Sequence, residues 1–329
     1  MDAWPGEARE LVGVLHIHTR FSDGSGSPGE IAGIARTLGL DFIGINDHMS
    51  LGARRAGFGG WDRGLLVLAG AELEDRWLGG HHLLVYGIDE IPSCRRPEEM
   101  IDAVNSSGGI AIAAHPRERR GHLPMTRSIR WRSVPKGLGG VEVWNYMSQW
   151  KAGVTLLDLR RRLGNPDDYV KGPSRDDVAF WERAGGCAVA GPDAHAFVLG
   201  AMRWRKVAFP YEMLLSRLRT HVLLDRGLPD GDYRAEASVL DALRRGICFV
   251  SNAMLGDARG FRAIRGNGAL DLHIPGPGRL AVSSGGGRAE ADTRGGREVI
   301  AIPPVGPVTV EILREGSTWI WCGLSWRSC

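Results

Sequence analysis

Histidines and carboxylates stand at the downstream ends of short apolar runs in this chain of 329 residues. Most of the ten histidines follow such a run, often with an aspartate or glutamate close by. Imidazole nitrogens and carboxylate oxygens are ligands for divalent metal ions such as Zn, Mn and Fe. The pattern predicts that several metal ions are held together by residues that include His16, His18, Asp47, His48, His115, Asp193 and His195.

His16 and His18 stand two residues apart at the end of the run LVGVLHIHT. Side chains two apart in a β-strand project from the same face, so both imidazoles are expected side by side, as half of a metal site. An HxH pair alone is weak evidence for a metal. Asp23, in the continuation HIHTRFSDG, adds a carboxylate from the following loop and strengthens the prediction.

Glu72 ends the apolar run LAGAE, where a buried carboxylate would lose its hydration and needs compensation. Bridging two metal ions is one such compensation, and an exposed strand end is the alternative. His81 and His82 begin the next run and must face opposite ways, so only one is expected to point inward. We favour His82 as that residue.

The remaining candidates are His115, which precedes a strand-ending proline, and the DxH pair Asp193 and His195. Asp47 could orient a ligand histidine instead of binding metal, because metal-bound imidazoles usually need such a partner. Three histidines are expected not to be ligands, namely His122, His221 and His273.

Alternating strands and helices between about residue 11 and residue 210 must position these side chains. The alternation predicts parallel strands with right-handed crossovers. An open, doubly wound sheet would also fit, but polar residues at the ends of so many strands favour a closed barrel, in which those ends converge on one face. The predicted strands are 11–18, 40–47, 65–72, 81–88, 109–115, 140–145 and 187–193.

Several helix boundaries are visible in the sequence. Ser27, Pro28 and Glu30 form a capping box with proline at the first helical position, and Gly39 ends that helix. Helical spacing further predicts amphipathic helices on the outside of the barrel at 210–224 and 235–246, the second ended by Gly246, and other helices at 97–108 and 174–185.

The character of the chain changes beyond about residue 255. Glycine and proline become dense, and the apolar runs 270–274, 280–284, 308–313 and 318–322 are short and alternating. Frequent glycine and proline between short alternating apolar runs are typical of antiparallel β structure. We therefore expect an α/β barrel with flanking helices over residues 8–255 and a small antiparallel β-rich domain over residues 256–329.

Composition excludes several classes of protein. With 43% hydrophobic and 24% charged residues, the chain has an ordinary globular composition. A net charge of +3 falls short of a nucleic-acid-binding profile, and no apolar stretch is long enough to span a membrane. No secretory signal is visible, so a cytoplasmic location is expected. Five cysteines without a CxxC pair argue against disulfides and thiolate zinc sites; they are Cys94, Cys187, Cys248, Cys322 and Cys329.

Five motifs in order resemble those of the PHP (polymerase and histidinol phosphatase) family of metal-dependent hydrolases: HIHTRFSDG, GINDH, GAELE, GIAIAAHP and GPDAH. The resemblance covers roughly residues 11–210. It implies a distorted seven-stranded, TIM-like β/α barrel with two or three divalent metal ions, Zn, Mn or Fe, at its C-terminal face. The later stretches 220–231 and 239–261 resemble a subgroup with a C-terminal β extension that includes carbamate hydrolases. Asn46 departs from the threonine that commonly precedes the Asp-His pair.

Carried over residue by residue, the resemblance implies three metal positions. The first would be held by His16, His18, Glu72 and Asp193. The second would be held by Glu72, His82 and His115, and the third by Asp23, His48 and His195.

The expected reaction is hydrolysis by a metal-bound hydroxide, because clustered cations lower the pKa of bound water. Glu72 and His195 are the expected catalytic residues. A small phosphate ester is the favoured substrate, with Arg117 and Arg119 as predicted anion-binding residues. They belong to a basic group that could attract an anion and that continues with Arg120, Arg127, Arg130 and Arg132.

Two alternatives to phosphate ester hydrolysis stay open at this point. The same centre could hydrolyse a carbamate or another carboxylic ester or amide. The protein could also be a metal-stabilised binding module without catalysis.

Overall fold

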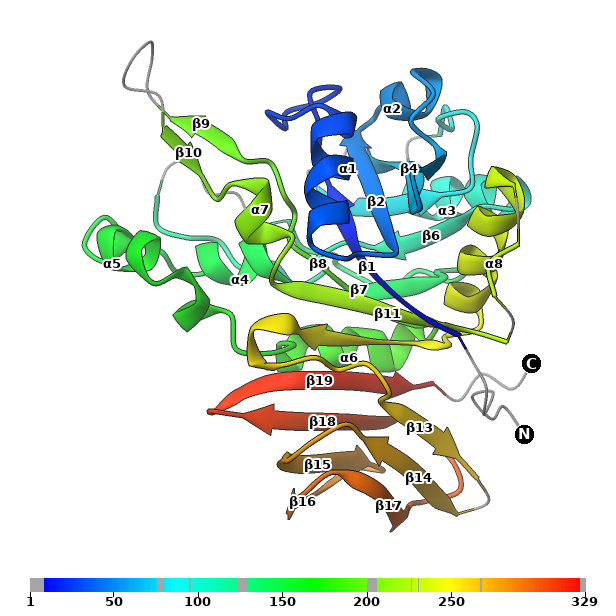
Figure 1. The fold of residues 1–329 in the computed structure, drawn as a ribbon, viewed down its shortest axis with the longest axis vertical. Helices are drawn as coiled ribbons and strands as arrows, with labels where there is room; N and C mark the ends of the chain where they lie inside the picture. Colours follow the sequence, from blue (N-terminus) through cyan, green and yellow to red (C-terminus); the bar gives the residue numbers. More distant parts are fainter. Residues whose placement is uncertain are drawn as a thin grey trace.

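The computed structural model describes residues 9–75, 80–94, 96–123, 129–199, 206–225, 227–229, 231–266 and 268–325 (Figure 1). The first part alternates strands with helices. Its strands are β1 (Arg9–Ile17), β2 (Phe42–His48), β3 (Gly60–Asp62), β4 (Leu65–Glu74), β5 (His82–Tyr86), β6 (Ile110–Ala113), β7 (Gly140–Asn145), β8 (Cys187–Gly191), β9 (Phe197–Leu199), β10 (Lys206–Ala208), β11 (Leu218–Leu224) and β12 (Cys248–Asn252). Its α-helices are α1 (Pro28–Thr37), α2 (Gly52–Arg55), α3 (Pro97–Ser106), α4 (Tyr146–Lys151), α5 (Leu159–Gly164), α6 (Arg175–Ala184), α7 (Tyr211–Leu214) and α8 (Asp232–Arg244).

The large sheet is mixed rather than all-parallel. Its strand order runs β8-β7-β6-β5-β4-β2-β1-β11-β12 and continues into the C-terminal part of the chain. The predicted parallel pairing holds for β1 with β2, β2 with β4, β6 with β7 and β7 with β8. It is wrong for β5, which is antiparallel to both its neighbours. The link between β4 and β5 is residues 75–81, and a parallel crossover needs a dozen residues or more.

The inward side chains of these strands form one common core. The cluster joins Leu15 of β1, Leu68 of β4, Ile112 of β6 and Val189 of β8 with residues of α8, which include Leu243. The chain after β8 also returns to β1, where Ile17 and Ala194 form an isolated parallel bridge. The strands therefore curl around a shared interior in a mixed α/β arrangement, without the regular hydrogen-bonded ladder of a TIM barrel.

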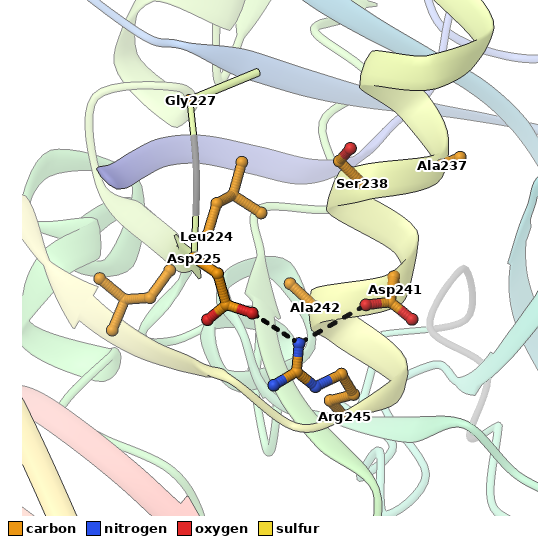
Figure 2. A pocket seen from close by; sticks show the side chains of 9 residues that line it. Leu224, Asp225, Gly227, Ala237, Ser238, Asp241, Ala242 and Arg245 are labelled. Atoms are coloured by element: carbon orange, nitrogen blue, oxygen red, sulfur yellow. Dashed lines mark hydrogen bonds and ion pairs between the residues drawn. The ribbon is translucent and has the colours of Figure 1, made fainter. Parts of the chain in front are cut away.

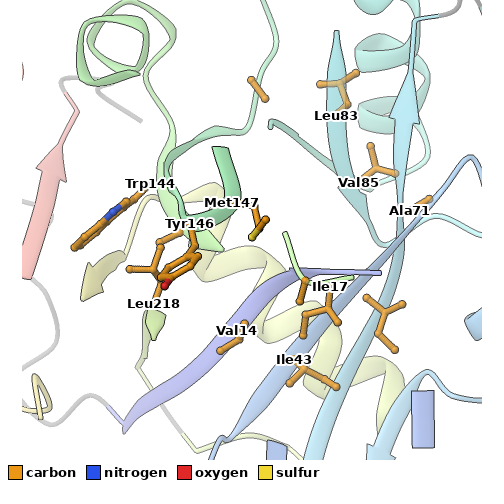
Figure 3. Packing of buried hydrophobic residues seen from close by; sticks show 14 of the residues in the cluster. Val14, Ile17, Ile43, Ala71, Leu83, Val85, Trp144, Tyr146, Met147 and Leu218 are labelled. Atoms are coloured by element: carbon orange, nitrogen blue, oxygen red, sulfur yellow. The ribbon is translucent and has the colours of Figure 1, made fainter. Parts of the chain in front are cut away.

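A second apolar cluster covers the other face of the same strands, and Figure 3 shows part of it. Val14 of β1 and Ile43 of β2 belong to this cluster with Ile31 of α1, Val104 of α3 and Phe180 of α6. Because alternate residues of each strand enter alternate clusters, the strands are buried on both faces. This double burial explains their near-continuous apolar sequences.

The predicted start of the first helix is confirmed in detail. The Ser27 side chain accepts a hydrogen bond from the backbone N–H of Glu30, and the Glu30 carboxylate accepts one from the N–H of Ser27. Pro28 is the first residue of α1, and Gly39 follows the helix with φ of +66°. The predicted helix at 235–246 overlaps α8, which ends at Arg244, and Gly246 follows in the left-handed conformation, as its predicted helix-ending role requires.

The predicted helix at 210–224 is wrong for most of its length. Only Tyr211–Leu214 is helical, and β11 begins at Leu218. All seven residues of β11 are buried between β1 and β12, so their polar side chains bond inside the protein instead of facing water. Thr220 bonds to the backbone of Ala190, and His221 bonds to Glu10 and Ser251. The apparent helical spacing came from these satisfied polar residues.

The C-terminal part is β-rich, as expected. Strand β19 pairs with β12, and the path β19-β18-β15-β16 extends the large sheet. A separate sheet has the order β13-β14-β17. The strands are β13 (Arg262–Arg265), β14 (Ala269–Ile274), β15 (Gly278–Ser284), β16 (Gly287–Thr293), β17 (Gly296–Ala301), β18 (Val308–Arg314) and β19 (Ser317–Leu324).

Aromatic side chains join this part to the rest of the molecule. Trp321 of β19 packs edge-on against Trp181 of α6, with ring centroids 5.4 Å apart. Phe249, Phe261 and Trp319 belong to a third apolar cluster between β12 and the C-terminal strands. The two parts thus share both a sheet and packed side chains.

A pocket of about 520 Å³ lies between the end of β11 and α8 (Figure 2). Arg245 crosses it and pairs with Asp225 at 3.1 Å and Asp241 at 3.7 Å. Leu224, at this end of β11, pairs with Arg9 at the start of β1, whereas His16 lies near the end of β1. The pocket is therefore at the opposite end of β1 from the predicted metal ligands.

No helix in the described part of the chain is long and apolar enough to cross a membrane.

Candidate metal centre

All nine side chains predicted as metal ligands come together at one end of the large sheet. Among the described residues, ligand atoms lie within 4.8 Å of one another in four overlapping groups. These groups are His16 with His18 and Glu72; His48 with Glu72 and His82; His18 with Asp23, His48 and His195; and His16 with His115 and Glu142. Asp193 joins the first group through its contacts with both histidines.

The first group has short nitrogen–oxygen distances that suit one shared metal ion. The Nε2 atom of His16 lies 3.4 Å from both Glu72 Oε2 and Asp193 Oδ1. The Nε2 atom of His18 lies 3.3 Å from each of the same two oxygens. Neighbouring ligands at about 2.0–2.2 Å from one metal ion are themselves roughly 3 Å or slightly more apart, so these four separations are short enough for a shared ion. Both Nε2 atoms are buried and lack a hydrogen-bond partner among the described residues, so the group fits a divalent ion.

Strained backbone conformations orient some of these side chains toward the centre. His16 has φ of +66°, and the register of β1 against β2 shifts between Val14 and Ile17. The two imidazoles therefore reach the same oxygens through a bulge and not through simple strand alternation, which corrects the sequence-based reason. Asp193 and His115 also have positive φ, at 58° and 25°. Left-handed backbone is costly for residues with a side chain and concentrates at functional sites.

Glu72 extends from the first group to a second. Its Oε1 atom lies 2.7 Å from Nδ1 of His82 and 3.4 Å from Nε2 of His115. His81 faces away, where it pairs with Asp75 at 3.1 Å and lies beside the ring of Trp131. The structure thus brings His82, and not His81, to the predicted second position.

The third group surrounds Asp23 at the open side of the centre. Asp23 Oδ1 lies 3.2 Å from Nε2 of His195 and 3.7 Å from Nε2 of His48. The Asp23 side chain is 53% exposed and that of His48 is 24% exposed, whereas the side chains of His18 and Glu72 are buried. Solvent therefore reaches the centre on the side of the third group.

Glu142 is an important residue that the sequence analysis missed. Its Oε1 atom lies 2.8 Å from Nδ1 of His16, and its Oε2 atom accepts hydrogen bonds from the backbone N–H of His115 and from Nδ2 of Asn145. A Cβ atom at Gly191 would meet Glu142 Oε1 at 2.8 Å, so glycine lets β8 approach closely. A lone glutamate in the apolar strand GVEVWN is the signal that singled out Glu72, and it could have identified Glu142 too.

Asn46, which departs from the family pattern, also supports His16. Its Oδ1 atom accepts hydrogen bonds from the backbone N–H of His16 at 3.2 Å and from the Tyr86 hydroxyl at 2.6 Å. Its Nδ2 atom donates to the carbonyl of Ala71. Asn46 therefore helps to fix the bulged backbone of β1 against β4.

Asp47 positions a loop and does not contact a ligand ring in any described hydrogen bond. Its carboxylate accepts hydrogen bonds from the backbone N–H and hydroxyl of Thr19, at 2.7 and 2.8 Å, and from the hydroxyl of Ser22 at 2.8 Å. The loop that these bonds hold leads directly to Asp23. Asp47 thus orients a different ligand from the histidine we expected.

Tyr211 ties together the loops of the third group. Its hydroxyl lies 2.8 Å from the carbonyl of His18 and 3.1 Å from the carbonyl of His195, and it accepts a hydrogen bond from the N–H of Gly26. One hydroxyl proton serves the two carbonyls, so the bonds are shared. Tyr211, the first residue of α7, therefore joins the loops that carry the ligands of the third group.

Glu118 and Lys151 support His115 from behind. Glu118 Oε2 lies 3.5 Å from Nδ1 of His115, and Glu118 Oε1 lies 2.8 Å from the ammonium of Lys151. A carboxylate behind a metal-ligating imidazole fixes its orientation and its tautomer. Glu118 stands in this position.

Nearby carboxylates together outweigh the effect of burial on the pKa of His48 and of His115. Burial lowers the pKa of His48, but Glu74 and Glu72 together raise it to about 9. Burial likewise lowers the pKa of His115, and Glu118 with Glu72 raises it to about 9. Without a metal, these imidazoles carry protons that offset the carboxylate charge. A divalent ion would take over that role and release the protons.

The predicted anion-binding arginines have other partners. The Arg117 guanidinium donates to the carbonyl of Trp131 at 3.2 Å and lies over the ring of Phe180. The Arg119 guanidinium pairs with Asp176 at 2.8 Å. Arg127 lies outside the described residues. Among the described hydrogen bonds and ion pairs, none joins Arg117 or Arg119 to a candidate metal ligand.

The other sequence-based expectations have plain outcomes. None of His122, His221 and His273 belongs to a metal-binding group among the described residues. The cysteines that the structure describes, Cys94, Cys187, Cys248 and Cys322, are free, and Cys329 lies outside the described residues.

Comparison with known proteins identifies a solved structure with a similar fold. No family model matches the chain. An uncharacterized protein of Methanocaldococcus jannaschii is 29% identical over 143 residues, which are 40% of this chain and 80% of that protein. The crystal structure of a two-domain protein of Bacteroides vulgatus, described as containing a predicted PHP-like metal-dependent phosphoesterase, covers 97% of this chain and 96% of its own, with a TM-score of 0.50 and 14% identity. An amidohydrolase of Chromobacterium violaceum aligns with 56% of this chain and 87% of its own, with a TM-score of 0.33 and 18% identity.

The near-complete alignment with the Bacteroides vulgatus protein shows that this chain has a PHP-like fold followed by a β-rich part. The resemblance that the five ordered motifs indicate is thereby confirmed at the level of the fold.

Proposed function

We propose that this protein is a metal-dependent hydrolase of the PHP type and that it cleaves a small phosphate ester. One observation carries the proposal: two buried imidazole nitrogens, without other partners among the described residues, each lie 3.3–3.4 Å from the same two carboxylate oxygens. Buried polar atoms without partners are costly, and a bound cation is the compensation that this donor set fits.

The ligand assignment follows the distances. His16, His18, Glu72 and Asp193 would hold one ion, Glu72 with His82 and His115 a second, and Asp23 with His48 and His195 a third. The donors are nitrogen and oxygen only, which suits two or three ions of Zn, Mn or Fe. We also propose that the strands form the distorted seven-stranded barrel of the family, over residues 8–255, and that residues 256–329 are a small antiparallel β-rich domain joined to it through the shared sheet.

The side chains of the centre have distinct tasks in the proposed reaction. Bound divalent ions would supply an acidified water molecule and positive charge for the attacked ester. Glu72 is proposed as catalytic because its two oxygens reach two groups at once. His195 is proposed as catalytic because it lies beside exposed Asp23, where an ester would enter. Glu142 keeps a proton on Nδ1 of His16, so the lone pair of Nε2 faces the centre.

A phosphate ester is favoured because several closely spaced cations can bind its non-bridging oxygens. The Bacteroides vulgatus protein, which shares this fold, is described as containing a predicted PHP-like metal-dependent phosphoesterase. Arg117 and Arg119 remain proposed contacts for an anionic substrate, although each has another partner in the structure.

A carboxylic ester, carbamate or amide is the second candidate for the substrate. The engagement of Arg117 with Trp131 and of Arg119 with Asp176 favours it, because a neutral substrate would need no free arginine. The same ions would serve a carbonyl group.

Hydrolysis of p-nitrophenyl phosphate, bis-p-nitrophenyl phosphate and 1-naphthyl methylcarbamate by metal-loaded protein tests the proposal. We expect turnover of a phosphate ester that is lost in His16→Ala and Asp193→Ala and abolished by chelation. Turnover of the carbamate alone would transfer the assignment to the second candidate. Bound metal without turnover of any substrate would indicate a binding module.

A further inference from the structure

His48 lies between two of the groups of candidate ligands and belongs to both of them. Its Nε2 atom lies 3.7 Å from Oδ1 of Asp23, in the third group. Its Nδ1 atom lies 3.3 Å from Oε2 of Glu72. A neutral imidazole has one lone pair for a metal ion and one N–H, so the position of the proton decides which nitrogen of His48 binds metal.

Glu74 forms the shortest ion pair of His48 and is not one of the proposed ligands. It ends β4 two residues after Glu72, so both glutamates project from the same face of the strand. Oε1 of Glu74 lies 2.7 Å from Nδ1 of His48, which has no aligned hydrogen-bond partner among the described residues. The contact is therefore electrostatic. A negative charge at this distance favours the proton on Nδ1 even without alignment, and Nε2 is then left to bind metal.

The backbone fixes His48 and Glu74 against each other. Strands β2 and β4 are parallel, with His48 opposite Glu72. The N–H of Met49 donates to the carbonyl of Glu72 at 2.9 Å, and the N–H of Glu74 donates to Sδ of Met49 at 3.2 Å. Pairing of the two strand ends thus holds the carboxylate of Glu74 beside His48.

A carboxylate at Nδ1 of one imidazole recurs at the other two proposed ions. Glu142 lies 2.8 Å from Nδ1 of His16, and Glu118 lies 3.5 Å from Nδ1 of His115. Carboxylates in this place orient metal-binding imidazoles and fix their tautomer. The side chains of Glu142 and Glu118 are buried, whereas that of Glu74 is 37% exposed.

His195 indicates which nitrogens face the third ion. Its Nδ1 atom lies 2.9 Å from the carbonyl of Asp193, and its Nε2 atom lies 3.2 Å from Oδ1 of Asp23. A carbonyl oxygen can only accept, so Nδ1 of His195 carries the proton and Nε2 is left for the ion. With its proton on Nδ1, His48 offers its Nε2 atom to the same position.

We infer that Glu74 is a positioning residue that assigns His48 to the third metal ion by keeping the proton of the imidazole on Nδ1. This inference rests on the proposed metal-dependent function. Without Glu74, nothing at Nδ1 favours the proton there over Nε2, and His48 binds the third ion less tightly.

Competition between a metal indicator and the metal-loaded protein tests the inference without any reaction. We expect Glu74→Ala to bind one ion about tenfold less tightly and the other ions like the wild-type protein; the loss is at the low end for a supporting carboxylate because solvent reaches Glu74. Glu74→Gln should lose less, because its amide oxygen can still accept from Nδ1–H of His48.

Glu290→Ala is the matched control. Its carboxylate is 32% exposed and pairs with Arg279 and Arg288, on β16 at the far edge of the large sheet. This variant should bind every ion like the wild-type protein. Equal weakening of all ions in Glu74→Ala would show that Glu74 only supports the fold, and an unchanged affinity would show that it does not position His48; either result would overturn the inference.

Anomalous diffraction from crystals of the loaded proteins shows which nitrogen of His48 is used. We expect a peak at Nε2 of His48, near Asp23 and His195, in the wild-type protein and a weaker peak there in Glu74→Ala. A peak at Nδ1 of His48, or peaks at the other two positions with none beside His48, would overturn the inference and leave the proposed function standing. A wild-type protein that binds no metal at all would refute the proposed function and the inference with it.

Discussion

The substitution Glu142→Gln removes the group that orients His16 and leaves all nine proposed metal ligands in place. The carboxylate of Glu142 faces three donors: Nδ1–H of His16 on one oxygen, and the N–H of His115 with Nδ2 of Asn145 on the other. Glutamine has one carbonyl oxygen and one amide nitrogen in these places. Two donors outnumber one, so the glutamine oxygen should turn toward His115 and Asn145.

That orientation puts the amide nitrogen of glutamine against Nδ1 of His16. The imidazole then has to accept at Nδ1 and carry its proton on Nε2, where it can no longer bind a metal ion. Loss of such a supporting carboxylate typically weakens metal binding about 10- to 100-fold. The expected loss is about 1.4–2.7 kcal/mol of binding free energy for the ion held by His16.

Competition with a metal indicator at constant pH measures this loss, and circular dichroism verifies the fold of the variant. Glu236→Gln is the matched control, because Glu236 is a buried glutamate on α8 that pairs with Arg54 away from the centre. It should bind metal like the wild-type protein. Wild-type affinity in Glu142→Gln, or an equal loss in both variants, would refute the reasoning.

Three further predictions follow from the same geometry. His82→Ala should lose bound metal, whereas His81→Ala should keep it, as measured by elemental analysis; the opposite result would reverse the assignment. Tyr211→Phe removes a buried hydroxyl that joins three loops, so the free energy of unfolding should fall by about 1–3 kcal/mol in urea denaturation, and an unchanged midpoint would contradict the role of that hydroxyl. His48 and His115 have folded-state pKa values of about 9 against an ordinary 6.5, so their contribution to stability is complete below pH 6.5 and is lost as the pH rises through 9. The Tm of chelator-treated protein should fall across that window, and a Tm that rises there would show that the sign is wrong.

The clustering of the candidate ligands was largely predictable because these residues stand at strand ends. His18, His48 and Glu72 follow apolar runs that become β1, β2 and β4, and a curved sheet brings such ends together. The proposed assignment of side chains to individual ions came from the resemblance to the PHP family and not from the strand pattern.

The backbone conformation that brings the His16 side chain to the carboxylates could not be predicted from the same pattern. Alternation in a regular strand accounts for two side chains on one face, but His16 adopts a positive φ inside a bulge. That conformation depends on partners 30 and 178 residues away, the side chain of Asn46 and the backbone of Ala194. Only the folded sheet brings these partners to the bulge.

The segment 210–224 shows a second limit of periodicity. Helical spacing suggested an amphipathic helix, yet Arg219, Thr220 and His221 lie in a strand that is buried on both sides. The hydrogen bonds of Thr220 and His221 reach β1, β12 and the region of β8. Polar residues that bond inside the protein look in the sequence like residues that face water.

Anomalous X-ray diffraction from crystals of metal-loaded protein tests the central claim most directly. The account predicts a peak about 2.0–2.2 Å from Nε2 of His16 and from Nε2 of His18, between the carboxylates of Glu72 and Asp193. Further peaks are expected beside His82 or Asp23. A protein that binds metal elsewhere, with no peak between His16 and His18, would contradict the account.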